Sequence, residues 1–222
     1  MTSLFHHPYC KPHILHPIES IKCLFISLKW VCQRGKKGYC ERDLSEVKGW
    51  FFEIMPKMLN EIKKEKSRIP MECYEEAIAA VGVDPAEYWD TFHNDLYSRY
   101  CEQVEGLAGK KWDEILSRIA FLLSEANADT CTKKNPYEDE YRRIRKEFQA
   151  KYGEFGKNLM TNEEKKQAKK GYPRWYFLFD IPEYKKVYES YLAEEKNLAE
   201  YRKKSAKEGL ELFAKWFYRL TE

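Results

Sequence analysis

Apolar residues recur along most of the chain at intervals of three and four, the spacing that places side chains on one face of an α-helix. The pattern predicts helices over residues 18–33, 43–66, 71–81, 84–104, 110–126, 136–152, 161–170 and 182–220. Only residues 171–179 have a strand-like composition, and the chain offers them no partner strand. We therefore predict an all-α fold with about seven or eight helices around one core and a long C-terminal helix.

The strongest pattern begins at a basic, glycine-bounded turn over residues 34–38 and enters the helix predicted over 43–66. Asp43 is the expected N-cap of this helix, and Glu46 would complete a capping box. The apolar stripe of the helix consists of Val47, Trp50, Phe51, Ile54, Met58 and Ile62. Pro56 lies inside the pattern and lacks a backbone N–H, so it predicts either a kink or a division into two helices.

Local signals also mark the other helices. The first helix carries an apolar stripe at Ile18, Ile21, Phe25, Leu28 and Cys32. We expect this stripe to face the core, although a helix lying on a membrane surface shows the same pattern. Asp84 before Pro85 and Thr161 before Glu164 are expected helix starts, and Gly82 is the expected end of the helix over 71–81. Gly106 and Gly109 predict a break in the middle of the chain.

Length and composition fit a folded protein. The chain has 222 residues, of which 43% are apolar and 15% aromatic, which is enough to form a core and too aromatic for a disordered chain. Residues 1–17 hold three prolines and four histidines without any period, so we expect a flexible or extended arm. Residues 18–222 are then a single helical domain. Seven irregularly spaced cysteines fit reduced thiols in a cytoplasmic protein.

Charge is distributed unevenly along the chain. Residues 1–37 carry a net charge of +5, residues 71–130 carry −9, and residues 131–170 carry +5. The three regions could neutralise one another in the folded protein. Alternatively, a basic face could meet an anionic ligand or an acidic partner.

Sequence signatures of catalysis are missing. The chain has no P-loop, no nucleophile elbow and no H-E-x-x-H pair, and the histidines of the N-terminal arm match no closed zinc site. His93 is the only histidine beyond residue 16, and a partly buried structural role is its simplest interpretation. We therefore expect a non-enzymatic protein without a metal or cofactor, and we rank an enzyme last.

The basic turn is the first candidate site. Cationic and aromatic side chains gather there just before a helix N-terminus, where unpaired N–H groups and the helix dipole favour anions. The candidate ligand-binding residues are Arg34, Lys36, Lys37, Tyr39, Arg42 and Trp50. The two rings would stack on a nucleotide base. The simpler interpretation is a solvated connection between helices, because Asp43 already occupies part of that helix end.

A second basic group supports an alternative function, nucleic-acid binding through residues 133–170. Its candidate residues are Lys134, Arg142, Arg145 and Lys146. Acidic residues such as Glu138 and Glu147 are interleaved with them. Ion pairs between residues three or four apart on the same helix are therefore the simpler account.

Two blocks of the sequence resemble a family of uncharacterised proteins from bacteriophages and related Firmicute genomes. The first spans residues 38–45 (GYCERDLS) and 55–59 (MPKML), and the second spans residues 112–117 (WDEILS). The chain departs from the family pattern at Ser45, where tryptophan is usual, and at Ser117, where an acid is usual. The resemblance implies a viral or prophage setting, in which small proteins that bind host components are common. It carries no activity.

These observations lead to one functional hypothesis and one alternative. We expect a binding protein of the host cytoplasm that captures an anionic ligand, such as a nucleotide signal of bacterial immunity, or a host protein. Such a protein would inhibit host defence, and it could form homo-oligomers. The alternative is a nucleic-acid-binding protein that uses residues 133–170. No association with a membrane is expected, because residues 18–30 are too short and too charged to span one.

Overall fold

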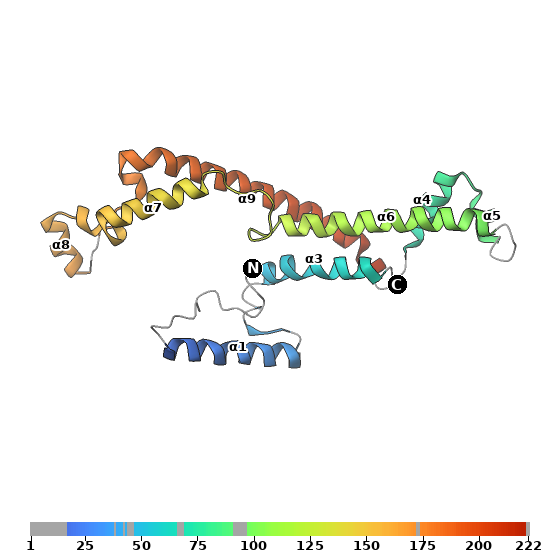
Figure 1. Cartoon of the computed structure of the whole chain (residues 1–222), viewed down its shortest axis with the longest axis horizontal. Helices are drawn as coiled ribbons and strands as arrows, with labels where there is room; N and C mark the ends of the chain where they lie inside the picture. The colour runs from blue at the N-terminus through green and yellow to red at the C-terminus, as the bar shows by residue number, and fades with distance from the viewer. Residues whose placement is uncertain are drawn as a thin grey trace. The chain divides into compact units, whose positions relative to one another are not determined.

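The computed structural model describes residues 17–37, 39–41, 43, 47–65, 69–90, 97–171 and 174–220, and it contains no strand among them. The α-helices are α1 (Pro17–Lys37), α3 (Val47–Glu65), α4 (Met71–Val81), α5 (Pro85–Asp90), α6 (Tyr97–Glu125), α7 (Glu138–Tyr152), α8 (Asn162–Lys169) and α9 (Pro182–Trp216) (Figure 1). Short 3₁₀ helices are η2 (Glu154–Leu159), η3 (Leu178–Asp180) and η4 (Phe217–Leu220). The predicted all-α fold with a long C-terminal helix is confirmed.

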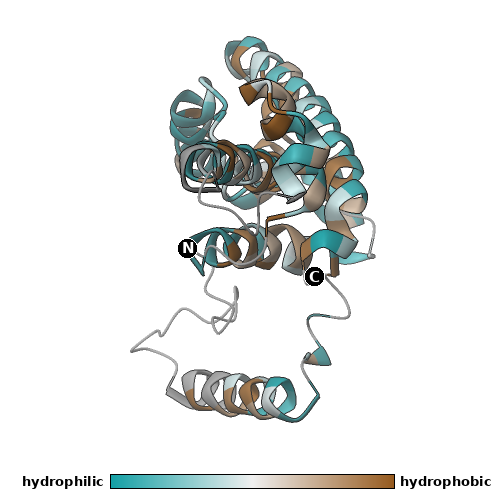
Figure 2. Ribbon diagram, turned by 90° about the vertical axis from the view of Figure 1, so that its right-hand side faces the viewer, coloured by the Kyte–Doolittle hydropathy of each residue, from teal (hydrophilic) through white to brown (hydrophobic). Residues whose placement is uncertain are grey.

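Hydrophobic and hydrophilic residues alternate along the helices, as amphipathic helices require (Figure 2). Among the described residues, no helix has the length and apolar composition needed to cross a membrane.

The start and stop signals of the short helices are confirmed. The helix α4 ends at Gly82, whose φ of 79° is the left-handed conformation that glycine adopts easily. Asp84 caps α5 by accepting the Ala86 N–H at 2.7 Å. The capping box of α8 is complete, because Thr161 and Glu164 each accept the backbone N–H of the other.

The predicted break at Gly106 and Gly109 is wrong, because α6 continues through both glycines. A glycine inside a helix costs about 1 kcal/mol relative to alanine. The neighbouring Val104, Ala108 and Trp112 are all buried in the core. Their burial outweighs the cost of the two glycines.

The connection between the first two long helices also differs from the prediction. Arg34, Lys36 and Lys37 belong to the last turn of α1, so residues 34–37 are not a turn. The helix α3 begins at Val47 and runs on through Pro56, so the proline does not divide it into two helices. Glu46 and the capping box predicted for it lie outside the described residues.

The chain divides into two compact units. Unit 1 comprises residues 1–131 and 204–222, and unit 2 comprises residues 132–203, so α9 contributes its first part to unit 2 and its last part to unit 1. Each unit has its own hydrophobic cluster. The expectation that residues 18–222 form a single domain stays a prediction.

In unit 1, α6 packs against α3 and α4. The fully buried side chains of this core include Leu59, Ile78, Leu116, Ile119 and Leu123. The last part of α9 lies on the same core, where Trp216 and Trp112 have ring centroids 5.6 Å apart. The chain is continuous at Gly209, where a Cβ atom would lie 3.0 Å from Leu123. The glycine therefore allows a close approach between α9 and α6.

In unit 2, α7 packs against η2 and η3. The buried side chains of its cluster are Ile144, Phe148, Leu178 and Tyr184. Residues 174–177 are irregular, and Phe177 has extended backbone angles. The strand-like stretch is therefore an extended connection here, as predicted, and it supplies part of the wall of a cavity in this unit.

Candidate functional site: an aromatic pocket in unit 2

Unit 2 contains a cavity of about 380 Å³, which we call the aromatic pocket. Four separate segments line it. Its lining residues are Tyr141, Arg145, Phe148 and Gln149 of α7, Gly153 with Glu154 and Phe155 at the start of η2, Tyr176 and Phe177 of the extended connection with Leu178 of η3, and Tyr188 of α9. The volume falls within the range of small-molecule sites, and apolar or aromatic walls with a few polar groups are typical of such sites.

The helix α7 supplies one wall because its lining residues recur at helical spacing. Arg145, Phe148 and Gln149 lie four, seven and eight residues after Tyr141. Three acidic residues in the first turn stabilise the start of this helix through its dipole. Burial of Ile144 and Phe148 anchors it to the cluster of unit 2.

The loop after α7 has an unusual backbone. Gly153, Phe155 and Gly156 all have positive φ angles, of 77°, 53° and 67°. Phe155 is the only residue other than glycine with positive φ among the described residues. Such a conformation costs about 1–2 kcal/mol for a residue with a side chain, and strained residues of this kind cluster at functional sites.

The strained loop is held against the extended connection. The Tyr176 N–H donates to the Phe155 carbonyl oxygen at 3.2 Å, and the Phe155 and Trp175 rings lie 4.9 Å apart. A Cβ atom at Gly156 would lie 2.6 Å from the Cβ atom of Tyr176. Only glycine leaves room for this approach of the two segments, so the pocket wall depends on it.

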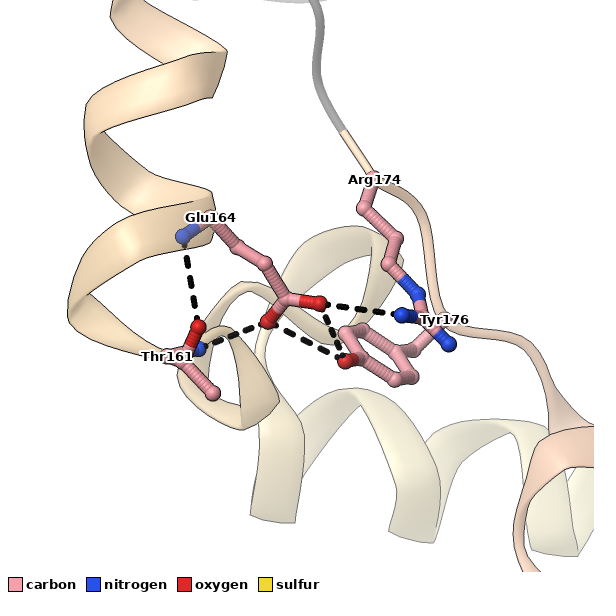
Figure 3. Close-up of polar contacts among 4 residues, drawn as sticks. All are labelled: Thr161, Glu164, Arg174 and Tyr176. Carbon is pink, nitrogen blue, oxygen red and sulfur yellow. Dashed lines mark hydrogen bonds and ion pairs between the residues drawn. The ribbon is translucent and has the colours of Figure 1, made fainter.

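The carboxylate of Glu164 fixes the position of the extended connection (Figure 3). It accepts a hydrogen bond from the Thr161 backbone N–H at 2.8 Å as part of the capping box. The same carboxylate accepts from the Tyr176 hydroxyl at 3.0 Å and from Arg174 at 3.2 Å. The start of α8 is therefore tied to one of the rings that line the pocket.

Hydrogen bonding shifts the titration of both partners. The Thr161 N–H, followed by the Tyr176 hydroxyl, stabilises the ionised Glu164 and lowers its pKa. The bond to the Glu164 carboxylate, together with desolvation, raises the pKa of Tyr176. The carboxylate therefore remains an acceptor and the tyrosine a donor at neutral pH.

Among the described residues, Arg145 is the one guanidinium that lines the pocket. Arg142 pairs with Glu138 at 2.7 Å, and Arg143 pairs with Glu140 and Glu147. Arg145 is exposed and forms no ion pair with any residue that the structure describes. The only carboxylate among the described lining residues, that of Glu154, lies 3.5 Å from the Lys157 ammonium group. The pocket therefore offers one uncommitted positive charge beside several rings.

The structure places the predicted basic residues near residue 34 differently. Arg34 is committed to Asp43, with its Nε and Nη2 atoms 2.9 and 2.5 Å from the two carboxylate oxygens. Lys36, Lys37 and Tyr39 are exposed, Trp50 is half-buried, and Arg42 lies outside the described residues. No contact between described residues brings these side chains together around a cavity, and their role in ligand binding stays a prediction.

The carboxylate of Asp43 bonds to residues that precede it, and residues 44–46, which it was expected to cap, lie outside the described residues. Its carboxylate accepts the N–H of Cys40, three residues before it, at 2.8 Å. This is the bond that the third residue of a capping box makes to the N-cap.

The ion pair between Arg34 and Asp43 predicts a stability change in acid. The bonds from Arg34 and then from Cys40 lower the pKa of Asp43 from 3.8 to about 2. A carboxylate whose pKa is lower in the folded state stabilises the protein above pH 4 and loses that contribution as the pH falls toward 2. We expect Asp43→Asn to cost roughly 1–2 kcal/mol at pH 6 and much less at pH 2.5. Urea unfolding at both pH values measures the difference, and an equal cost at both would contradict this assignment.

Sequence reasoning identified Arg145 but did not place it beside the aromatic residues. Its other candidates, Lys134 and Lys146, are exposed, and Arg142 is held by Glu138 as the helical spacing predicted. The missed residues are Tyr141, Phe148, Phe155, Tyr176, Phe177 and Tyr188. Two signals pointed to them, the glycine-interrupted stretch 153–160 and the aromatic stretch 171–179. Neither signal shows that the two stretches are in contact.

The histidines contribute nothing to the described site. Those of the N-terminal arm and His93 all lie outside the described residues. Across the parts of the chain that the structure does describe, no three His, Cys, Asp or Glu side chains are grouped closely enough to hold a metal ion.

No protein-family model, curated protein or solved structure matches this chain. The geometry of the aromatic pocket is therefore the basis on which a function can be inferred.

Proposed function

We propose that the protein is a non-enzymatic binding protein that captures an anionic aromatic ligand, of the nucleotide class, in the aromatic pocket. The observation that carries the proposal is Arg145, a guanidinium without an ion-pair partner among the described residues, in the wall of a cavity lined by aromatic rings. A ligand with a planar ring and a negative charge satisfies both features. The aromatic rings favour the planar part through stacking, and the guanidinium favours phosphate.

The remaining polar groups fit this ligand class. Gln149 presents an amide that can both donate to and accept from the edge of a base. Arg145 lies one helical turn before Gln149 on the same face of α7. A charge-assisted bond between a guanidinium and a phosphate is roughly twice as strong as a neutral one. The phosphate end of the ligand therefore belongs beside Arg145, and the base belongs among the rings.

Two kinds of ligand suit the pocket, a small nucleotide and a side chain of a host protein. If the sequence blocks that resemble bacteriophage proteins reflect such an origin, the ligand would be a nucleotide signal of bacterial immunity, whose capture would inhibit host defence. The rings exposed at the pocket, Phe155 and Phe177, also suit a side chain of a host protein. Arg145, which has no ion-pair partner among the described residues, favours the small ligand, because a host side chain that stacks on the rings would not use its charge.

The alternative, nucleic-acid binding through residues 133–170, has less support. A long polyanion requires a continuous row of available cations. Ion pairs occupy Arg142 and Arg143, so the basic face of α7 is largely neutralised. Binding to single-stranded DNA at two salt concentrations distinguishes the two functions. A polyanion site would weaken steeply with salt, whereas a single phosphate contact would weaken only slightly.

Calorimetric titration with mono- and cyclic nucleotides tests the proposal directly. We expect at least one of them to bind, and Arg145→Gln to weaken that binding about 10- to 100-fold, because a charge-assisted bond is lost. The matched control is Arg142→Gln, which removes the same charge from the same helix outside the pocket lining. If no nucleotide binds, or if both variants weaken binding equally, the proposal is wrong.

Trp175 offers an independent readout. It is the only tryptophan of unit 2. Its ring lies against the ring of Phe155, which lines the pocket. Labelling with fluorotryptophan should therefore give one resonance that moves when a nucleotide binds in the pocket. Trp175→Phe assigns that resonance.

A further inference from the structure

The helix α1 exposes the apolar stripe that was expected to face the core. The α1 stripe consists of Ile21, Phe25, Leu28 and Cys32, and the first three are 55%, 68% and 52% exposed. Cys32 is also exposed. The expectation for these residues is therefore wrong in the single chain, and Ile18 lies outside the side chains that the structure describes. Exposed apolar residues in a continuous row are characteristic of surfaces that bind a partner.

The helix α3 carries a second stripe of the same kind. Its buried residues, Phe52, Pro56 and Leu59, face the core of unit 1. A separate row, which we call the α3 stripe, consists of Val47, Trp50, Ile54 and Met58. Val47 and Met58 are 57% and 49% exposed, and the other two are half-buried. A helix that is apolar over so much of its circumference normally has partners on two sides.

The two stripes match in length. Each extends over eleven residue steps, which is about 16 Å along a helix axis. Their residues recur at intervals of three and four, as in pairs of helices that pack side by side. Each stripe could therefore cover the other completely.

Two residues that follow α1, Glu41 and Asp43, bond to side chains of α1 that lie outside the α1 stripe. Glu41 accepts hydrogen bonds from Lys29 and Gln33, and Asp43 accepts from Arg34. At 100° per residue, these three donors lie roughly 70° to 150° around the helix from the centre of the stripe. Glu41 and Asp43 therefore lie on a side of α1 that does not carry Phe25 and Leu28.

We propose that these stripes form the interface of a homodimer, in which the α1 stripe of one copy packs on the α3 stripe of the other. The exchange is reciprocal, so two identical helix pairs are buried and the assembly closes with two-fold symmetry. In a single chain Phe25 is 68% exposed and Met58 is 49% exposed, so the two stripes do not cover each other. A lipid surface would account for the α1 stripe alone, but it would leave the equal stripe of α3 unexplained.

Sedimentation equilibrium over a wide range of protein concentration tests this inference. We expect a dimer for the natural sequence and at least a tenfold rise in the dissociation constant for Phe25→Glu and for Met58→Glu. The matched control is Ile26→Glu. Ile26 lies about 130° around α1 from the centre of the stripe and is 38% exposed, so this variant should remain dimeric. Circular dichroism checks that each variant keeps its helix content.

Three results would overturn the inference. A monomer at every concentration removes the dimer altogether. A dimer that survives Met58→Glu but not Phe25→Glu shows that α1 pairs with something other than α3. The third result is a monomer that floats with vesicles of equal parts phosphatidylcholine and phosphatidylglycerol. If Phe25→Glu abolishes this flotation, the α1 stripe binds a lipid surface instead.

Discussion

Replacing Gly156 by alanine is expected to destabilise unit 2 by about 2–4 kcal/mol and to abolish ligand binding in the aromatic pocket. Two costs add. The φ of 67° at this position is unfavourable for any residue with a Cβ atom, by about 1–2 kcal/mol. The new Cβ atom would also lie 2.6 Å from the Tyr176 Cβ and 3.3 Å from its carbonyl oxygen, so the extended connection must move.

Gly171→Ala is the matched control for this variant. Gly171 belongs to the same unit and has a φ of 92°, but a Cβ atom there would meet nothing within 4 Å. It should therefore cost only the backbone term, about 1–2 kcal/mol. Urea unfolding monitored by the fluorotryptophan resonance of Trp175 measures both variants in unit 2. Equal costs for the two glycines would show that Tyr176 does not approach the loop closely at Gly156.

The loss of binding has its own physical reason. Tyr176 forms part of the pocket wall, and its position depends on the Phe155 carbonyl on one side and on Glu164 on the other. A displaced Tyr176 cannot keep both bonds. Nucleotide binding should therefore be lost in Gly156→Ala even at temperatures where unit 2 remains folded. Gly171→Ala should bind like the natural sequence.

The sequence predicted the helices better than it predicted the site, because the two depend on different kinds of information. Gly82, Asp84 and Thr161 act on residues within four positions of themselves, so their roles can be read locally. The break predicted at Gly106 failed because burial of the residues around it, which depends on α3 and α4, outweighs the local preference. Local signals therefore mark helix ends well and helix continuity poorly.

The aromatic pocket depends on contacts between distant segments. Phe155 and Tyr176 are separated by twenty-one positions and meet because Gly156 allows it. Nothing in the spacing of either segment encodes that meeting. Arg145 was a candidate as one of a basic group with Arg142 and Lys146, and acidic residues at helical spacing predicted ion pairs within that group. That reasoning correctly predicted the ion pairs of α7, but it did not locate the rings beside the remaining cation.

The second large effect is expected in the core of unit 1. Ile119 of α6 has no exposed surface, and we expect Ile119→Ala to reduce the free energy of unfolding of unit 1 by about 3–4 kcal/mol. The variant loses the apolar contacts of three carbon atoms and leaves a cavity between packed helices, which can collapse only in part. Binding of a nucleotide in unit 2 should persist wherever unit 1 remains folded, because Ile119 is not part of the pocket lining.

Phe121→Ala is the control on the same helix. Phe121 is larger than Ile119, but it is 45% exposed. Its truncation should cost less than about 1 kcal/mol, because it removes little buried surface. Fluorescence of Trp112 and Trp216, whose rings are 5.6 Å apart in this core, reports the unfolding of unit 1 in urea. If Phe121→Ala were the more damaging of the two, the face of α6 that packs on α3 and α4 would be the opposite one, and the core of unit 1 would have to be reassigned.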